Sequence, residues 1–187
     1  EDSMSNLANA LNTLAGQKLH ALLLGFAALT LSSNALSLAS DKQEKVTWEA
    51  AGNSNMTVEN GLRTLTLEDS VIVTQGSLRI TGDRAIFEYA VESNELNRIT
   101  VYGSPVGYSQ QLSTDGENVA GTSKELRLYS DENTSDSIVE LIGDAAISSP
   151  DSTMNCAAIT YLVDLDLIRE AKGPCNGSLS STSPQGN

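Results

Sequence analysis

The sequence is poor in the side chains that most enzymes and metal sites use. Its 187 residues include one histidine, His20, and two cysteines, Cys156 and Cys175. Histidine is the commonest general base and metal ligand, and no G-x-S-x-G, Walker-type or G-x-G-x-x-G motif occurs. These absences exclude most hydrolase, nucleotide-binding and zinc-dependent mechanisms, so we expect neither catalysis nor a cofactor.

Basic residues are also few. The chain has 11 Lys and Arg against 24 Asp and Glu, which gives a net charge of −13 and a pI of about 4.3. Nucleic-acid binding depends on clustered basic residues, so no nucleic-acid partner is expected. An anionic lipid would have to bind through its apolar part rather than by charge. Aromatic residues make up only 4%, so Val, Ile and Leu must supply most of the core.

Two acidic segments contain the residue types of a functional site without the spacing. The segment 131–136 resembles the start of a calcium loop, but Asp136 stands where that loop needs Gly, and Ile142 where it needs Glu. Asp164 and Asp166 could form a glycosidase pair. Both segments are better explained as turns, where acids keep an exposed loop soluble.

The N-terminal segment has the features of an export signal. Residues 21–31 form an apolar run of the length of a signal-peptide core, and the run is too short to cross a bilayer comfortably. Small residues, Ser37 and Ala39, precede the expected cleavage before Ser40, with a cut after Ala35 as an alternative. We expect residues 1–39 to be an export signal with an N-terminal extension; a buried helix or an uncleaved anchor are the alternatives.

The two cysteines lie in the exported part, which fits an oxidising compartment. If residues 163–167 form a hairpin turn, the centre of this turn falls midway between Cys156 and Cys175, which would then face each other across paired strands. The predicted disulfide closes a loop of about 19 residues, for which the chain-entropy model gives roughly 3 kcal/mol. Two free thiols are the alternative.

Period-two alternation dominates residues 40–175, in short segments separated by Gly, Asn, Asp, Ser or Pro. This pattern predicts an all-β domain of many short antiparallel strands, as in a sandwich, barrel or jelly roll. We expect strands at 45–50, 56–59, 63–67, 70–75, 77–82, 85–89, 98–102, 106–110, 118–121, 125–130, 137–142, 145–148, 153–156, 159–163 and 165–171. Residues 176–187, rich in Ser, Gly and Pro, are expected to be disordered.

A loose internal repeat supports a hairpin unit that recurs along the chain. Residues 67–87 align with 141–161, and a fragment of the same unit occurs at 99–108. If the apolar members of each alternation point inward, one apolar interior results. Whether that interior is a packed core or a ligand groove depends on whether the two sheets close on each other.

The segment 70–85, SVIVTQGSLRITGDRA, resembles the LptA family, the OstA-like proteins of periplasmic lipopolysaccharide transport. The likeness lies in a V-x-V strand, a Gln-Gly turn and an L-x-I strand that ends in a small residue and Asp. Segments 103–108, 119–121, 139–147 and 159–163 follow in the family's order, so the resemblance covers roughly residues 45–172. Residues 46–51 depart from the family's usual Pro-Ile-x-Ile strand, and the cysteines look like a local addition.

The resemblance implies a twisted, open β-jelly roll that holds lipid acyl chains between its sheets. It also implies a periplasmic, head-to-tail homo-oligomer that bridges an LptC-like inner-membrane partner and an LptD-like outer-membrane partner, stacking through strands 45–50 and 165–171. Alignment with the family points to Val46, Trp48, Tyr108 and Leu128 as acyl contacts. The expected lipopolysaccharide groove comprises these residues together with Val58, Leu67, Val73, Ile80, Phe87, Leu141 and Tyr161.

Three other functions compete with this interpretation. An LptC-like component of the same pathway would keep residues 21–31 as a membrane anchor. A closed structural or adhesive β-sandwich would have a dry core and no lipid site. An enzyme acting on envelope polysaccharide is the least favoured, because the domain lacks histidine and a well-placed carboxylate pair.

Overall fold

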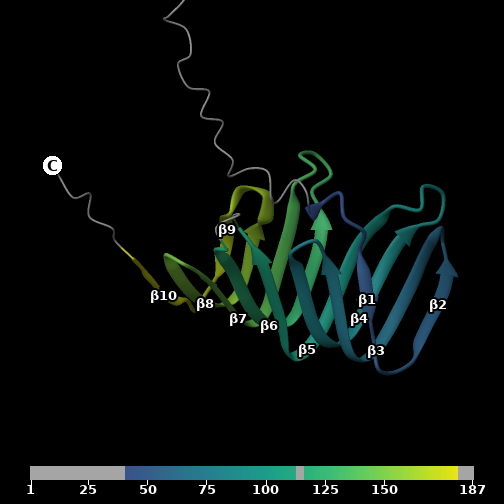
Figure 1. Ribbon diagram of the computed structural model, residues 1–187, viewed down its shortest axis with the longest axis horizontal. Helices are drawn as coiled ribbons and strands as arrows, with labels where there is room; N and C mark the ends of the chain where they lie inside the picture. The colour runs from purple at the N-terminus through teal and green to yellow at the C-terminus, as the bar shows by residue number, and fades with distance from the viewer. Residues whose placement is uncertain (1–40, 113–115, 181–187) are drawn as a thin grey trace, which may run out of the picture. The chain divides into compact units, whose positions relative to one another are not determined.

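The computed structural model describes residues 41–112 and 116–180, and these residues form one antiparallel sheet of ten strands (Figure 1). The strands are β1 (Thr47–Glu49), β2 (Ser54–Glu59), β3 (Leu62–Gln75), β4 (Leu78–Ala90), β5 (Leu96–Gln111), β6 (Asn118–Ser130), β7 (Ser137–Ser149), β8 (Ser152–Leu162), β9 (Leu167–Lys172) and β10 (Asn176–Leu179). A 3-10 turn, η2 (Val163–Leu165), joins β8 to β9. The prediction of an all-β fold is confirmed.

The strands β3 to β8 are about twice as long as the sequence pattern predicted. Each combines two predicted segments, as β3 combines 63–67 with 70–75. The interruption between the segments is a shift in the pairing register rather than a chain reversal, as between Glu68 and Val71 in β3. Polar and glycine residues at these points looked like turns because a β-bulge uses the same residue types.

Five of the seven register shifts, one between each two neighbouring long strands, line up across the sheet. They occur at Glu68/Val71, Thr81/Arg84, Tyr102/Val106, Thr122/Glu125 and Ile142/Ala145. Because a bulge bends its strand, a continuous line of bulges folds the sheet over along that line. Each long strand therefore contributes one part to each of two half-sheets.

We call these parts half-sheet A and half-sheet B. Half-sheet A contains β2, residues 62–68, 84–90, 96–102, 125–130, 137–142 and 158–162 of the long strands, and β9. Half-sheet B contains β1, residues 71–75, 78–82, 106–111, 118–122, 145–149 and 152–156, and β10. Figure 1 shows the order of the strands from β2 to β10.

One hydrophobic cluster fills the space between the half-sheets. Half-sheet A contributes Leu67, Phe87, Val101, Leu126 and Leu141, all fully buried. Half-sheet B contributes a matching set from the other arm of the same strands, Val71, Val73, Ile80, Val106 and Val119. The apolar alternation of each long strand therefore faces inward on both sides of the bend.

The predicted disulfide is present. Cys156 of β8 is bonded to Cys175, the residue that precedes β10. Strand β10 then pairs with Ser152–Asn155 of β8. The expectation that the chain is disordered from residue 176 was wrong for 176–179: the sequence there shows no apolar period because the whole strand is exposed, and backbone pairing next to the disulfide positions it. Residues 181–187 lie outside the described part.

The predicted export signal, residues 1–39, also lies outside the described residues. Within 41–112 and 116–180, no helix has the length and apolar character needed to cross a membrane.

Close packing at the bend requires a residue without a side chain at position 82, and this requirement can be tested. A Cβ at this position would lie 2.5 Å from Val101 Cγ1 and 2.7 Å from the carbonyl oxygen of Tyr102. A Cβ at Gly107 would meet only the Thr81 hydroxyl, at 2.8 Å, and that hydroxyl can rotate away. We expect Gly82→Ala to lower the free energy of unfolding by about 1–3 kcal/mol and Gly107→Ala by less. Urea unfolding of both variants measures the difference, and equal losses would contradict the importance of close packing at the bend.

Candidate functional site

The candidate site is a slit at the rim where half-sheets A and B come together. One space of about 310 Å³ is lined by Val46, Leu96–Ile99, Leu128 and nearby polar groups. A smaller space of about 30 Å³ is lined by Leu78 of half-sheet B, Leu128 of half-sheet A and Val163 of η2, together with polar residues. Leu128 lines both spaces, so it marks the point where the rim leads toward the apolar interior.

A larger hollow, of about 1020 Å³, continues from the slit between the β4–β5 and β6–β7 turns. It shares Leu96, Arg98 and Tyr129 with the slit. Its charged lining is mostly acidic, with Glu88, Glu95, Asp131 and Glu132 against Arg98, whose guanidinium lies 5.4 Å from the centre of the Tyr129 ring. An acidic hollow disfavours an anionic group, whereas the slit has fewer acidic side chains along its lining.

The residues predicted to contact lipid fall into three groups in the structure. Val46 and Leu128 are half-buried and line the slit. Trp48 and Val58 lie on edge strands β1 and β2 and are 42% and 60% exposed. The remaining residues are at most 2% exposed and belong to the packed cluster; they are Leu67, Val73, Ile80, Phe87, Tyr108, Leu141 and Tyr161.

The edge residues share the inner face with this cluster. Trp48 is paired directly with the buried Val73, and Met56 with the buried Leu65. Directly paired residues of neighbouring strands project from the same side of a sheet. The apolar inner face therefore continues to the β1 and β2 end of the sheet, where Trp48, Met56 and Val58 are exposed.

Two tyrosines of the packed cluster meet between the half-sheets. The rings of Tyr108 (half-sheet B) and Tyr161 (half-sheet A) meet edge to face, with centroids 6.5 Å apart. The Tyr108 hydroxyl donates to Gln110 Oε1 at 3.0 Å, and the Tyr161 hydroxyl to Asp166 Oδ1 at 2.7 Å. Burial raises the pKa of both phenols above the ordinary value. Each phenol thus has a polar partner while its ring packs against the other half-sheet.

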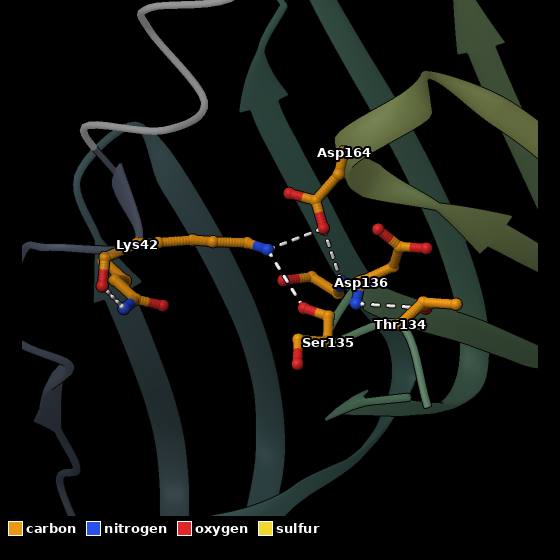
Figure 2. Close-up of polar contacts among 7 residues, drawn as sticks. Lys42, Thr134, Ser135, Asp136 and Asp164 are labelled. Atoms are coloured by element: carbon orange, nitrogen blue, oxygen red, sulfur yellow. Dashed lines mark hydrogen bonds and ion pairs between the residues drawn. The ribbon is translucent and has the colours of Figure 1, made fainter. Parts of the chain in front are cut away.

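A strap, residues 41–46, crosses the slit before β1 begins. On half-sheet B, Asp41 accepts hydrogen bonds from the Ser77 hydroxyl and from Gln110 Nε2. On the side of half-sheet A, Lys42 Nζ lies 2.7 Å from Asp164 Oδ2 of η2 and donates to the carbonyl oxygen of Ser135, in the β6–β7 turn, at 3.2 Å (Figure 2). No sequence signal indicates these contacts, because no periodicity marks residues 41–45 and the pair Lys42–Asp164 spans 122 positions.

The acids considered as catalytic or calcium-binding groups have structural partners. Asp164 accepts from Lys42 and from the Ser137 backbone N–H at 2.6 Å, and Asp166 accepts from Tyr161. Asp131 caps its own turn by accepting from the backbone N–H groups that follow it, and these bonds lower its pKa. The predicted turns are confirmed, and no group of three metal-binding side chains occurs in the part of the chain that the structure describes.

Comparison with known proteins identifies the family. Residues 50–166, more than half of the chain, match the family described as "LptA/(LptD N-terminal domain) LPS transport protein". The chain belongs to this family. The resemblance inferred from residues 70–85 is thereby confirmed.

Two relatives illustrate the family. Lipopolysaccharide export system protein LptA of Haemophilus influenzae is 27% identical over 131 residues, which cover 70% of this chain and 72% of that protein. The crystal structure of LptH from Pseudomonas aeruginosa, described as "the LptA homologous periplasmic component of the conserved lipopolysaccharide transport device", matches with a TM-score of 0.64 and 17% identity over 76% of this chain and 99% of that one. The match to LptH establishes that this chain has the family fold, an open β-jelly roll, although the two sequences are only 17% identical.

The buried phenol of Tyr108 predicts a dependence of stability on alkaline pH. Its pKa is raised above 10.0 in the folded protein, whereas an unfolded tyrosine ionises near that value. Below pH 10 both states are protonated, so the group adds no pH dependence; above it, the unfolded state loses the proton first and stability falls by about 1.4 kcal/mol per pH unit. We expect Tyr108→Phe to flatten this decline in urea unfolding measured between pH 8 and 12. Parallel declines in variant and wild type would show that Tyr108 is not responsible.

Proposed function

We propose that this protein is a non-catalytic periplasmic carrier that binds lipopolysaccharide through the acyl chains of its lipid A between half-sheets A and B, and passes it from the inner toward the outer membrane. The observation that carries the proposal is the continuous apolar inner face, open at the slit and at the β1 and β2 end, in a chain of the lipopolysaccharide transport family. The two relatives are named for export and for a periplasmic transport component.

The physical need for such a face follows from the ligand. Burial of about ten CH₂ groups of one acyl chain is worth roughly 8 kcal/mol, so a chain that crosses an aqueous compartment must stay covered. The half-sheets supply only aliphatic and aromatic side chains at the positions proposed to contact lipid. These are Val46, Trp48, Val58, Leu67, Val73, Ile80, Phe87, Tyr108, Leu128, Leu141 and Tyr161.

Opening of the slit is compatible with an intact sheet. All ladder hydrogen bonds run between neighbouring strands within one half-sheet, and the two halves are joined along the line of bulges. Separation of the halves breaks the Tyr108–Tyr161 contact and the strap contacts but no strand pairing. An acyl chain would then replace one set of apolar contacts by another, which limits the free-energy cost of loading.

Export and the lack of catalysis belong to the same proposal. The Cys156–Cys175 bond suits an oxidising compartment such as the periplasm. Asp164 and Asp166, the pair with the residue types of a glycosidase, are bonded to Lys42 and Tyr161 instead of facing a shared space. Sequencing the N-terminus of the exported protein separates this proposal from an LptC-like anchored protein: a start at Ser40 supports the carrier, and retention of residues 21–31 supports the anchor.

The edges of the sheet support head-to-tail assembly. At one end β1 and β2 both pair with β3, and at the other end β9 and β10 both pair with β8. Each of these four strands has one partner strand among the described residues. Unpaired edges of unlike sequence favour addition that propagates rather than closes. A homo-oligomer built in this way would join the inner faces of successive copies, between an LptC-like and an LptD-like partner.

A closed structural sandwich is the second candidate, and the buried edge-to-face contact between Tyr108 and Tyr161 favours it. Photo-crosslinking in living cells separates the two. A photoreactive side chain at Leu128, which lines the slit, should form adducts with lipopolysaccharide. The same group at Arg127 should form none, because this neighbour projects to the opposite face, where it bonds Glu125 at 2.6 Å. No adduct at Leu128 in a folded, exported protein would favour the closed sandwich.

The assembly proposal predicts the effect of a charge at the β2 edge. Val58 is 60% exposed, so Val58→Lys should change the free energy of unfolding by no more than about 0.5 kcal/mol. The same substitution should weaken self-association, because it places a charge in the apolar joint between copies. Light scattering after size exclusion, over a range of concentrations, measures the average mass. Wild-type association in the variant would mean that β2 is not part of the joint.

A further inference from the structure

We propose that the strap is a latch over the slit, and that its Lys42 exchanges Asp164 for a phosphate group of the incoming lipid. This inference rests on the proposed function and deepens it by naming the headgroup contact. It is built from the position of the strap, the strength of its two attachments and the charge around the rim.

The attachment of the strap to half-sheet B is made by several neutral and charge-assisted hydrogen bonds. Gln75 Nε2 donates to the Glu44 and Lys42 carbonyl oxygens, at 3.1 and 3.4 Å. Asp41 accepts from Ser77 and from Gln110, and Gln110 is itself held by Tyr108. This end of the strap therefore behaves as its hinge.

The polar attachment on the side of half-sheet A is made by one side chain. Lys42 Nζ reaches Asp164 Oδ2 and the Ser135 carbonyl oxygen, as Figure 2 shows. The Lys42 side chain is 42% exposed and that of Asp164 19%. A partly exposed ion pair of this kind shifts an equilibrium by only about two- to five-fold, so this end can detach.

Asp164 keeps a hydrogen-bond partner when Lys42 detaches from it. Asp164 Oδ2 also accepts the Ser137 backbone N–H at 2.6 Å, so the carboxylate stays hydrogen-bonded when Lys42 leaves. The ammonium is then free for another anion at the mouth of a space lined by Leu78, Leu128 and Val163. An amphiphile whose chains enter this space has its phosphate at the rim, beside Lys42.

The charges around the rim make Lys42 the best-placed cation to bind a phosphate. Arg98, the other cation that lines the slit, lies against the Tyr129 ring in the hollow with four acidic residues. A phosphate carries more charge than a carboxylate and offers three acceptor oxygens, so it competes well for one ammonium group. Phosphate on the lipid would therefore open the latch that covers its own binding site.

Two substitutions test the exchange in the full exported chain. Asp164→Asn keeps an oxygen for the Ser137 N–H but removes the charge that holds Lys42. Lys42→Gln removes the ammonium itself. The control is Lys124→Gln, which breaks a similar ion pair with Asp144, at 2.6 Å, beside the bend. Stopped-flow fluorescence follows loading with two probes, lipid A that carries both phosphates and the same lipid A after dephosphorylation.

The expected results differ for each variant. Wild type and Lys124→Gln should load the phosphorylated probe more tightly than the dephosphorylated one. Asp164→Asn should load both probes about two- to five-fold faster and keep the preference, because Lys42 remains. Lys42→Gln should also load faster but should bind both probes equally.

Each contrary result has its own meaning. A phosphate preference retained in Lys42→Gln would overturn the headgroup contact, and unchanged loading rates in both variants would overturn the latch. Either result leaves the proposed carrier function standing if wild type binds the probes. Failure of folded wild type to bind either probe would overturn the proposed function, and this inference with it.

Discussion

A line of bulges crosses the sheet and bends each of its long strands, β3 to β8. Without it, strands as long as β3 and β5 would form a broad sheet with one apolar face exposed to water. With it, each strand supplies both walls of the interior, so the apolar alternation in one half is covered by the alternation in the other. The same geometry leaves the two halves joined along one side only. A fold that buries its core in this way also has a built-in opening.

The sequence predicted the strands and their inward-facing residues correctly where a buried face produces a regular apolar alternation. Alternation at 63–67 and 70–75 located both arms of β3, and the inward assignment of residues such as Phe87 and Leu141 agrees with their burial. It did not distinguish a bulge from a turn, because both need residues that tolerate positive φ, as Asp69 and Ser70 do at the β3 bend. The number of strands was therefore overestimated and their length underestimated.

Contacts between polar groups far apart in the chain could not be predicted from the sequence. The pairing of β10 with β8 depends on backbone hydrogen bonds and on the position of Cys175, neither of which has a hydrophobic pattern. Lys42 and Asp164 likewise meet only because the fold places the strap over η2. Of the four residues chosen by alignment with the family, Val46 and Leu128 line the slit, and their role as acyl contacts stays a prediction. Inner-face alternation could not separate them from fully packed neighbours such as Ile80.

An acidic protein is a suitable carrier for an acidic lipid only if charge plays a small part in holding it. With a net charge of −13, the chain repels a phosphorylated headgroup at long range, and the acidic hollow beside the slit does so at short range. Retention must then come from apolar contact, which has no preferred direction along the inner face. On the proposed exchange, a single lysine at the rim would orient the headgroup without trapping it. On the proposed function, this balance favours movement along the face over tight storage at one site, and this is what a bridge between two membranes requires.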